Sequence, residues 1–375
     1  MEDSLIQKEI SNFKEFNITF ELGYEIGNSK DINEYKIVYQ KLNFYQLYIQ
    51  HYYMWIIAMN EVFIYLKRGC SLAFIRDFLA SLKNTISRAV YIQNKWTENT
   101  KFYSYFFDDV ALSLAILKRK KSQINIFSRT HGFETYDEQA PFKHIPFQAF
   151  KIKYFDAILP VSNQGANHLR HLFPLYKDKI NSLYLGTNSH SYINPFANDV
   201  HIVTCAYVRK VKRLYLMPEL LKSLDIKVTW SHIGEGDDFE ELKNSSKNLP
   251  DNIKVQFLGN QLASQIMEFY KHTPITCIVS LSSSEGLPLS MMEAISFGIP
   301  IISTDVGGCS EIVTNSTGFL IPKNVNTNDF IDALKQLLQS NINSIQGRNS
   351  VKSFWQSQFS AEKNYIKLKN KMDLR

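Results

Sequence analysis

The sequence is poor in the residues that mark secreted, metal-bound or fibrous proteins. Its 375 residues include only four cysteines, Cys70, Cys205, Cys277 and Cys309. None of them forms a Cys-x-x-Cys pair, so the spacing predicts neither a zinc site nor a disulfide framework, and free thiols in a reducing compartment are the simpler expectation. The composition, 45% hydrophobic and 21% charged, excludes a disordered, collagen-like or coiled-coil chain. The length predicts two domains, at roughly 100–200 residues per domain.

The sequence also lacks an apolar run long enough to span a bilayer. The most apolar stretch, 52–66, is interrupted by Asn60 and Glu61, whereas a spanning helix needs about 20 apolar residues. The acidic start of the chain has no signal-peptide apolar core. We therefore expect a cytoplasmic protein, with peripheral attachment to the inner face of the cell membrane as a further option.

The excess of positive charge is small and lies in the N-terminal half. The chain has 42 Lys and Arg against 36 Asp and Glu, a net charge of +6. Residues 1–197 hold 23 basic and 18 acidic residues, and residues 198–375 hold 19 and 18. This excess is too mild for a dedicated nucleic-acid binder, but it suits an acidic ligand or an anionic membrane surface.

The C-terminal half alternates short apolar runs with helical segments. The expected strands are 202–206, 227–233, 253–258, 275–281, 300–304 and 318–321. Because strands separated by short helices form a parallel sheet with both faces covered, this pattern predicts an α/β fold. Ligands of such sheets bind beyond the carboxyl ends of the strands, where Lys212, Gly234 and Glu285 are expected.

The N-terminal half has a weaker pattern. Its periodicity favours helices over 62–90, and strands are expected at 124–127, 157–161 and 179–185. The aromatic residues crowded into 35–66 are expected mainly in the core.

Four basic residues, 118–121, follow an apolar helical run. Two interpretations of this basic cluster stay open. It is either a docking site for anionic lipid, where each Lys or Arg contributes about 1 kcal/mol, or a soluble helix end whose cations complement the helix dipole.

The strongest chemical signal is the stretch 282–294, which holds two carboxylates eight positions apart. Glu285 lies in a turn after an expected strand, and Glu293 lies on the next helix, which is otherwise mostly apolar. An ionised carboxylate on such a helix is costly to bury without polar partners, and the vicinal hydroxyls of a sugar are suitable ones. The free N–H groups at the helix start, Leu289 and Ser290, offer a site for an anion. Together these features predict a pocket for a nucleotide sugar.

These residues resemble the signature of the group 1 (family 4) retaining glycosyltransferases, in which two glutamates flank a Gly-Leu-Pro sequence. The similarity continues at 232–236 and through 296–318. Residues 128–134 and 159–162 look like the family's bacterial polysaccharide-assembly members. The resemblance implies the GT-B fold, in which two Rossmann-like α/β domains face each other across a cleft and the last helix crosses back to the first domain.

The family's domain organisation can be carried onto this chain, because Asn194-Pro195 interrupts the pattern of strands and helices near the middle. We expect an N-terminal acceptor-side domain at 1–197 and a nucleotide-sugar donor-binding domain at 198–350. The segment 351–375 would be the helix that returns to the N-terminal domain.

The resemblance also implies a role for each matching residue. Glu285 would contact the donor sugar and face the reacting centre, Glu293 would hold the ribose diol, and Lys212 would stabilise the departing diphosphate. His131, from the opposed domain, would lie near the anomeric carbon and the acceptor. Electrostatic stabilisation of the leaving group is the main task, because the nucleoside diphosphate departs as an anion. The other donor-binding residues would be Gly286, Leu287, Pro288, Leu289, Gly234 and Arg209.

The reaction implied is transfer of a sugar from a UDP- or GDP-linked donor to a saccharide, or a lipid-linked oligosaccharide, in the synthesis of lipopolysaccharide or capsule. No cofactor and no nucleic acid are expected as partners. Metal-dependent glycosyltransferases of the other major fold use an Asp-x-Asp motif. Because the nearest candidate, Asp108-Asp109, lies in a helical context, no metal is predicted.

Two features depart from the family pattern. Tyr207 stands where an Arg is usual, five positions before Lys212. The glycine-rich loop after the first N-terminal strand is missing, since Gly23 and Gly27 do not reproduce it. These departures motivate one alternative, a non-catalytic glycosyltransferase-like partner subunit. A nucleotide-sugar epimerase on the same scaffold is a second alternative.

Overall fold

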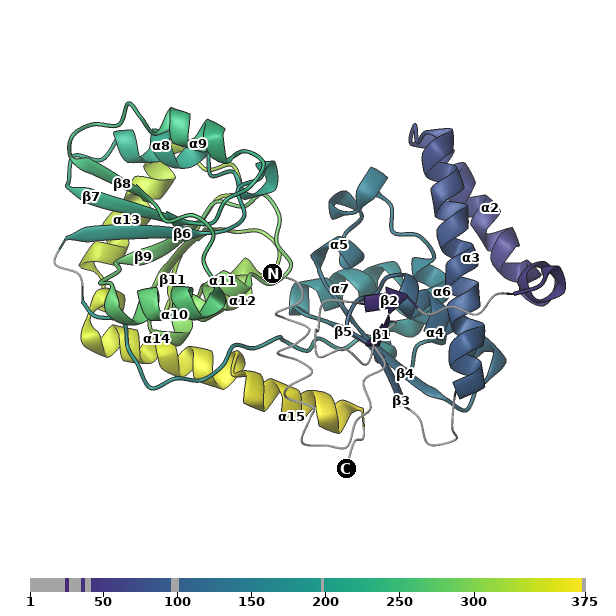
Figure 1. The fold of residues 1–375 in the computed structure, drawn as a ribbon. Coiled ribbons are helices and arrows are strands. Elements are labelled where there is room, and N and C mark those ends of the chain that lie inside the picture. The colour runs from purple at the N-terminus through teal and green to yellow at the C-terminus, as the bar shows by residue number, and fades with distance from the viewer. Residues whose placement is uncertain (1–23, 27–34, 38–41, 96–100, 197–198, 373–375) are drawn as a thin grey trace. The chain divides into compact units, whose positions relative to one another are not determined.

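The chain divides into two compact units in the computed structural model (Figure 1). The first unit comprises Met1–Leu183 with Lys369–Arg375, and the second comprises Tyr184–Leu368. The described residues are 24–26, 35–37, 42–95, 101–196 and 199–372. Gly23 and Gly27, which do not reproduce the family's glycine-rich loop, lie outside these residues.

The second unit is built on a six-stranded parallel sheet. Its strands are β6 (Val200–Cys205), β7 (Val228–Ile233), β8 (Ile253–Phe257), β9 (Cys277–Ser280), β10 (Ile301–Thr304) and β11 (Gly318–Ile321). They lie in the order β11-β10-β9-β6-β7-β8. The chain therefore starts in the middle of the sheet, winds to one edge, and then returns to wind to the other. The switch point lies between β6 and β9, and ligands of doubly wound sheets bind in the crevice that opens there.

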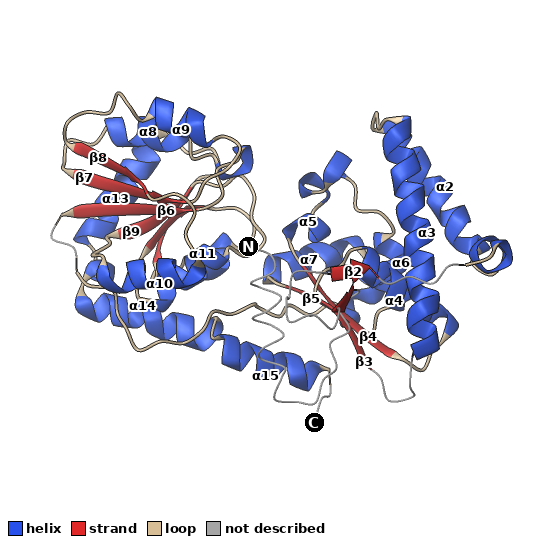
Figure 2. Ribbon diagram, viewed as in Figure 1, coloured by secondary structure: helices blue, strands red, loops and turns tan. Residues whose placement is uncertain are grey.

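Helices connect these strands and cover the sheet (Figure 2). The connecting helices are α8 (Leu216–Lys222), α9 (Phe239–Ser245), α10 (Ala263–His272), α11 (Leu289–Ser296) and α12 (Cys309–Ile312). After the last strand follow α13 (Thr327–Gln339), α14 (Ile345–Gln358) and α15 (Ala361–Lys371), whose last residues, from Lys369, belong to the first unit. All six strands expected in this half are present, shifted by two residues at most. The central strands are buried on both faces, as Ile202 and Val203 illustrate: these neighbours in β6 point to opposite faces, and both are fully buried. This burial explains why their sequences read as continuous apolar runs.

The second unit begins earlier than the expected boundary at 197/198. Asn194, which precedes that boundary, donates through Nδ2 to the carbonyl of Thr273 (2.8 Å) and accepts at Oδ1 from buried Arg348 (2.5 Å). Thr187 bridges to Ser360 and accepts a hydrogen bond from Trp355 Nε1 at 2.7 Å. Because these buried polar groups are satisfied only within the second unit, residues 184–196 fold with it.

The first unit contains a three-stranded parallel sheet in the order β3-β4-β5. The strands are β3 (Lys101–Ser104), β4 (Asn125–Thr130) and β5 (Ala157–Pro160). Its helices are α2 (Tyr52–Lys67), α3 (Leu72–Lys95), α4 (Asp109–Lys120), α5 (Gly132–Thr135), α6 (Gln148–Tyr154) and α7 (Asn163–Leu172), preceded by the π-helical segment η2 (Tyr45–Ile49). A separate antiparallel pair joins β1 (Tyr24–Ile26) to β2 (Tyr35–Ile37).

The helices of the first unit lie in successive layers. Helix α4 packs on the sheet, α3 packs on α4, and α2 packs on α3, on the side away from the strands (Figure 1). Within the described ranges, no helix combines the length and the apolarity that a bilayer span requires.

Two predictions for this half are wrong. No strand forms over 179–185: a 3₁₀ turn at Pro174–Lys179 leads to a single bridge between Ile180 and Ile158. The apolar side chains there are buried without forming a ladder, so burial alone produced the strand-like pattern. The aromatic stretch is not mainly core either, because a row of large apolar side chains from Phe44 to Leu66 is exposed.

Candidate active site

Two predicted site residues meet at the switch point of the second unit. Lys212 follows β6, Glu285 follows β9, and their Nζ and Oε1 atoms are 2.5 Å apart. Ser282 also donates its hydroxyl to Glu285 Oε1, at 2.6 Å. Both side chains are largely buried, with 20% of Lys212 and 11% of Glu285 exposed. A charge-assisted contact of this length fixes the carboxylate beside the ammonium group.

Arg213 links the loop that follows β6 to the loop that follows β9. No sequence pattern singled out this residue. Its guanidinium donates from Nε to the carbonyl of Leu281 (2.6 Å) and from Nη2 to that of Ser282 (3.1 Å). Ser283 N donates to Val211 O at 2.8 Å. The run of basic residues at 209–213 is the available signal, but it does not tell which cation faces inward.

A glycine permits the backbone of Glu285 to approach the neighbouring loop. Gly307 has a φ of +50°, and a Cβ atom there would lie 1.7 Å from the carbonyl oxygen of Glu285. Gly308 N donates to Gly286 O at 2.9 Å. The loop that carries Glu285 and Gly286 is therefore held on two sides, by Arg213 and by the 307–308 turn.

Glu293, the second glutamate of the predicted site, lies on helix α11. One face of this helix is buried. Leu287 and Pro288 are buried just before the helix, which begins at Leu289. Glu293 is half-buried, and its charge adds to the burial that raises the pKa of the Cys205 thiol to about 12. Leu289 supplies an N–H group at the positive end of the helix, so this part of the unit offers both an anion-binding end and a carboxylate.

The remaining donor-side predictions lie around the ends of β6 and β7. Gly234 has a φ of +127°, and a Cβ there would lie 2.2 Å from Ala206 O, so this glycine is required for close packing of the chain. Tyr207 donates its hydroxyl to Asp237 Oδ1 at 2.9 Å. Arg209 is exposed and lines a hollow of about 290 Å³, whose described lining residues do not include Glu285. The carbonyl oxygen of Arg209 accepts from Lys212 N at 2.8 Å, so Arg209 begins the turn that carries Lys212.

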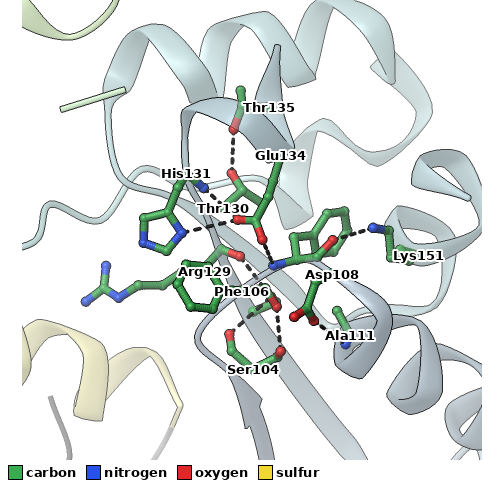
Figure 3. Close-up of polar contacts among 12 residues, drawn as sticks. Ser104, Phe106, Asp108, Ala111, Arg129, Thr130, His131, Glu134, Thr135 and Lys151 are labelled. Atoms are coloured by element: carbon green, nitrogen blue, oxygen red, sulfur yellow. Dashed lines mark hydrogen bonds and ion pairs between the residues drawn. The ribbon is translucent and has the colours of Figure 1, made fainter. Parts of the chain in front are cut away.

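His131 belongs to the first unit, where it caps helix α5 (Figure 3). Glu134 Oε2 accepts from His131 N at 3.0 Å and lies 3.2 Å from His131 Nδ1. Its Oε1 accepts from Phe107 N at 2.6 Å. Because a carboxylate only accepts hydrogen bonds, this contact places the proton on Nδ1. His131 Nε2 has no hydrogen-bond partner among the described residues, so it remains a potential acceptor.

Charged side chains, Lys151 and Asp108, lie on the other side of Glu134 from His131 (Figure 3). Lys151 is 3% exposed and donates to the carbonyl of Phe107. Burial lowers the pKa of Lys151 to about 8, although the carboxylates of Glu134 and Asp108 oppose this change. Burial, followed by repulsion from Asp109 and Glu134, raises the pKa of Asp108 to about 6.

The Asp108-Asp109 pair serves the fold of α4. Asp108 Oδ1 accepts from Val110 N (2.8 Å) and Ala111 N (3.4 Å), which caps the helix. Asp109 Oδ2 lies 3.0 Å from Arg88 Nη1. No three His, Cys, Asp or Glu side chains are grouped to hold a metal ion within the described part of the chain. The predicted catalytic set is thus divided between the units, with His131 in the first and Lys212 and Glu285 in the second.

Comparison with known proteins gives a family match in the C-terminal half. Residues 193–352 match the family model described as glycosyl transferases group 1, which confirms the resemblance predicted from the two glutamates. The O-antigen biosynthesis glycosyltransferase WbnH of Escherichia coli is 34% identical over 99 residues, 26% of this chain and 26% of that protein. The lipopolysaccharide 1,6-galactosyltransferase of Escherichia coli (strain K12) is 26% identical over 258 residues, 66% of this chain and 68% of that protein. The chain therefore matches about a quarter of the first relative's length and about two thirds of the second's.

Solved structures resemble a larger part of the chain. The lipopolysaccharide outer core galactosyltransferase WaaB, in its apo form, has a TM-score of 0.62 and 20% identity, and covers 77% of this chain and 80% of its own. Anabaena Alr3699/HepE, in complex with UDP and glucose, has a TM-score of 0.62 and 12% identity, and covers 76% and 81%. At these identities the likeness shows the fold alone, and it confirms the predicted GT-B glycosyltransferase architecture.

Proposed function

We propose that this protein is a glycosyltransferase that moves a sugar from a nucleoside diphosphate sugar to a saccharide acceptor in the synthesis of a surface polysaccharide. The observation that carries the proposal is the Lys212–Glu285 pair at the switch point of a group 1 glycosyltransferase unit. Relatives named for O-antigen and lipopolysaccharide synthesis support the choice of pathway.

The proposed donor is a UDP- or GDP-linked sugar. The similar structure of Alr3699/HepE is a complex with UDP and glucose, which supports a nucleoside diphosphate as a ligand of this fold. Glu293 would accept hydrogen bonds from the ribose hydroxyls, and Glu285 from the sugar hydroxyls. The Lys212 ammonium would then lie where the departing diphosphate gains negative charge, which is where a fixed cation lowers the barrier most. The N–H groups at Leu289 and Ser290 would add to this stabilisation.

We further propose that transfer is retaining and needs no metal ion. The bond between the anomeric carbon and the phosphate oxygen would break while the acceptor oxygen attacks on the same face. The acceptor's proton would pass to the leaving phosphate oxygen, so that charge and atoms balance. His131 would contact the donor sugar or acceptor through Nε2, with Glu134 holding its ring. The acceptor would be lipid-linked, and the protein would work in the cytoplasm at the inner face of the membrane.

The proposal is tested by Glu285→Gln, which keeps the shape of the side chain and removes its charge. With a panel of UDP- and GDP-sugars and membrane extract as acceptor, we expect nucleotide release to fall by about a hundredfold or more. Glu219→Gln is the matched control, because Glu219 is 72% exposed on α8 and pairs with Lys222 on the same helix. Full transfer by Glu285→Gln would contradict the role proposed for this residue.

Two further measurements address the finer proposals. Nuclear magnetic resonance of the product, compared with the donor, shows whether the anomeric configuration is kept, and inversion would exclude the retaining reaction. Activity after treatment with a chelator is expected to equal untreated activity. Loss of activity on chelation, followed by recovery with a divalent ion, would contradict metal independence.

A further inference from the structure

Helix α2 and the π-helical turn before it expose a series of large apolar side chains. More than half of the surface of most of these side chains is open to solvent. The row consists of Phe44 (71% exposed), Tyr45 (58%), Tyr48 (38%), Ile49 (51%), Tyr52 (60%), Ile56 (64%), Met59 (65%), Phe63 (55%) and Leu66 (47%). We call it the α2 row.

The α2 row occupies one side of the helix. Within α2, the exposed apolar residues start at Tyr52 and recur four, seven, eleven and fourteen positions later, the spacing of a single helical face. The opposite side of the helix is closed by the protein, since Met54, Ala58 and Val62 are buried. Helix α2 has 16 residues, so its part of the row is about 24 Å long.

Residues 42–76, all of which the structure describes, carry no exposed carboxylate. Between residues 42 and 76, Glu61 is the only acidic residue in the sequence. Glu61 is 7% exposed, accepts from Phe147 N at 2.9 Å and contacts His144 Nε2. Its charge therefore points into the protein, and the next acidic residue, Asp77, lies on α3 beside Arg76.

Cations flank the row instead. Lys67 is exposed at the C-terminal end of α2, with Nζ 4.4 Å from the centroid of the Phe63 ring. Near the other end, the Arg119 guanidinium lies 4.1 Å from the centroid of Tyr53. Burial lowers the pKa of His51, and the charge of nearby Lys120 adds to this decrease. Lys118, by contrast, is used within the fold, because it pairs with Asp156 at 2.9 Å.

From this arrangement we propose that the α2 row is a membrane-docking surface that lies flat on an anionic lipid bilayer. Tyrosine, phenylalanine and aliphatic side chains with flanking cations are the composition of helices that lie in the bilayer interface. The absence of exposed carboxylates over residues 42–76 favours a negatively charged surface as the occupant. The inference rests on the proposed membrane association and not on the transfer reaction.

The test measures co-sedimentation of the full chain with vesicles, without any sugar donor. We expect binding to vesicles of phosphatidylethanolamine with phosphatidylglycerol and weaker binding to phosphatidylcholine vesicles. The triple variant Ile56→Ser, Met59→Ser, Phe63→Ser should bind the anionic vesicles at least about tenfold more weakly, because it removes three inserted side chains. The variant Leu262→Ser, Ile345→Ser is the matched control, since both residues are exposed (70% and 71%) on the second unit.

A second set of variants separates the contribution of the flanking cations to vesicle binding from that of the inserted apolar side chains. Arg119→Gln with Lys120→Gln should weaken binding to anionic vesicles by roughly tenfold and leave binding to neutral vesicles unchanged. Glu285→Gln should bind as the unmodified chain does, so failure of the transfer proposal and failure of docking are distinguishable.

Three results would overturn the proposal. The first is equal vesicle binding by the triple variant and the control. The second is no vesicle binding by the unmodified chain. The third is a dimer, detected by light scattering, that dissociates in the triple variant while vesicle binding is absent, which would make a second copy the occupant of the row. Unchanged thermal unfolding of the triple variant shows that it is folded, as expected for substitutions at exposed positions.

Discussion

Lys151 is a fully enclosed cation whose partners are carboxylates and a backbone carbonyl. Its ammonium donates to Phe107 O and lies near Glu134 and Asp108. Removing one member of such a group leaves the others buried without a counter-charge, which costs several kcal/mol. The charge group therefore contributes to the stability of the loop that holds His131 as well as to its geometry.

We predict that Lys151→Met destabilises the first unit by about 3 kcal/mol. Lys153→Met on the same helix is the control, because Lys153 is exposed and surface changes usually stay within about 0.5 kcal/mol. Denaturant unfolding followed by circular dichroism checks the difference. Equal stability of the two variants would mean that the buried ammonium is not needed to balance the carboxylates.

A pH dependence follows from Asp108. Its folded pKa is raised to about 6, so between about pH 4 and 6 the folded state holds more protons than the unfolded one. The stability contributed by this group is present at low pH and is lost as pH rises through 6. Asp108→Asn keeps an oxygen for the helix cap and removes the titration. We expect the variant to gain about 1 kcal/mol relative to the unmodified chain between pH 5 and pH 7.

Thermal unfolding at both pH values, compared between the two proteins, measures this gain. A difference that does not change with pH would show that Asp108 does not titrate in this range. A variant that is less stable at both values by the same amount would point to the cap alone.

The strands and helices of the second unit were predictable because each central strand is buried on both faces. A strand in that position must be apolar throughout, so runs such as 300–304 are recognisable without any knowledge of the fold. The first unit gave a weaker signal. Strand β3 is short and only half-buried at Lys101, Phe102 and Tyr103, so nothing in its sequence separates it from a loop.

Helix α2 shows where sequence patterns fail. Apolar residues occupy both its exposed and its buried sides, as Ile56 and Met54 illustrate, so the sequence carries little amphipathic contrast. Which side of α2 is exposed depends on how α3 packs against it, and this packing is a property of the tertiary structure. The same reasoning applies to Arg213, whose positive φ and inward contacts could not be distinguished within a run of basic residues. Lys212 and Glu285, in contrast, were predicted to lie at the same edge of the sheet because each follows a strand, although their direct ion pair was not predicted.

The turn at Gly307 shapes the loop that carries Glu285, and it provides a test at the level of the element. We predict that Gly307→Ala lowers transfer activity at least about tenfold, because its Cβ would overlap Glu285 O (1.7 Å) and displace the carboxylate from Lys212. Gly69→Ala is the control. Gly69 also has a positive φ (+77°), but no atom lies within 4 Å of the added Cβ, so it tests backbone strain alone, about 1 kcal/mol.

Kinetics with a saturating donor, together with thermal unfolding of both variants, separate the two effects. If Gly307→Ala and Gly69→Ala lose the same stability but only Gly307→Ala loses activity, the effect of Gly307→Ala lies at the Glu285 loop. Full activity of Gly307→Ala would show that the loop tolerates movement and that the position of Glu285 is not set by this turn.

At the scale of the molecule, the residues proposed for donor binding all lie in the second unit, and the α2 row lies in the first. The basic excess of the chain is also concentrated in residues 1–197. Donor binding and membrane docking are thus assigned to different units, each with its own sheet and core. It follows that either property can be removed by substitution without loss of the other.

This separation makes the response to nucleotide specific to one unit. A ligand that binds only the folded state adds about 2.7 kcal/mol of stability at 100 times its dissociation constant. We predict that UDP or GDP raises the unfolding temperature of the second unit and slows amide exchange in residues 281–289, while exchange in β4 stays unchanged.

Lys212→Met should abolish the response, because it removes the cation that faces the diphosphate, whereas Lys222→Met on the exposed surface of α8 should retain it. Protection of β4 without protection of 281–289 would contradict the assignment of the nucleotide to the switch point, and equal responses of both lysine variants would contradict the role of Lys212.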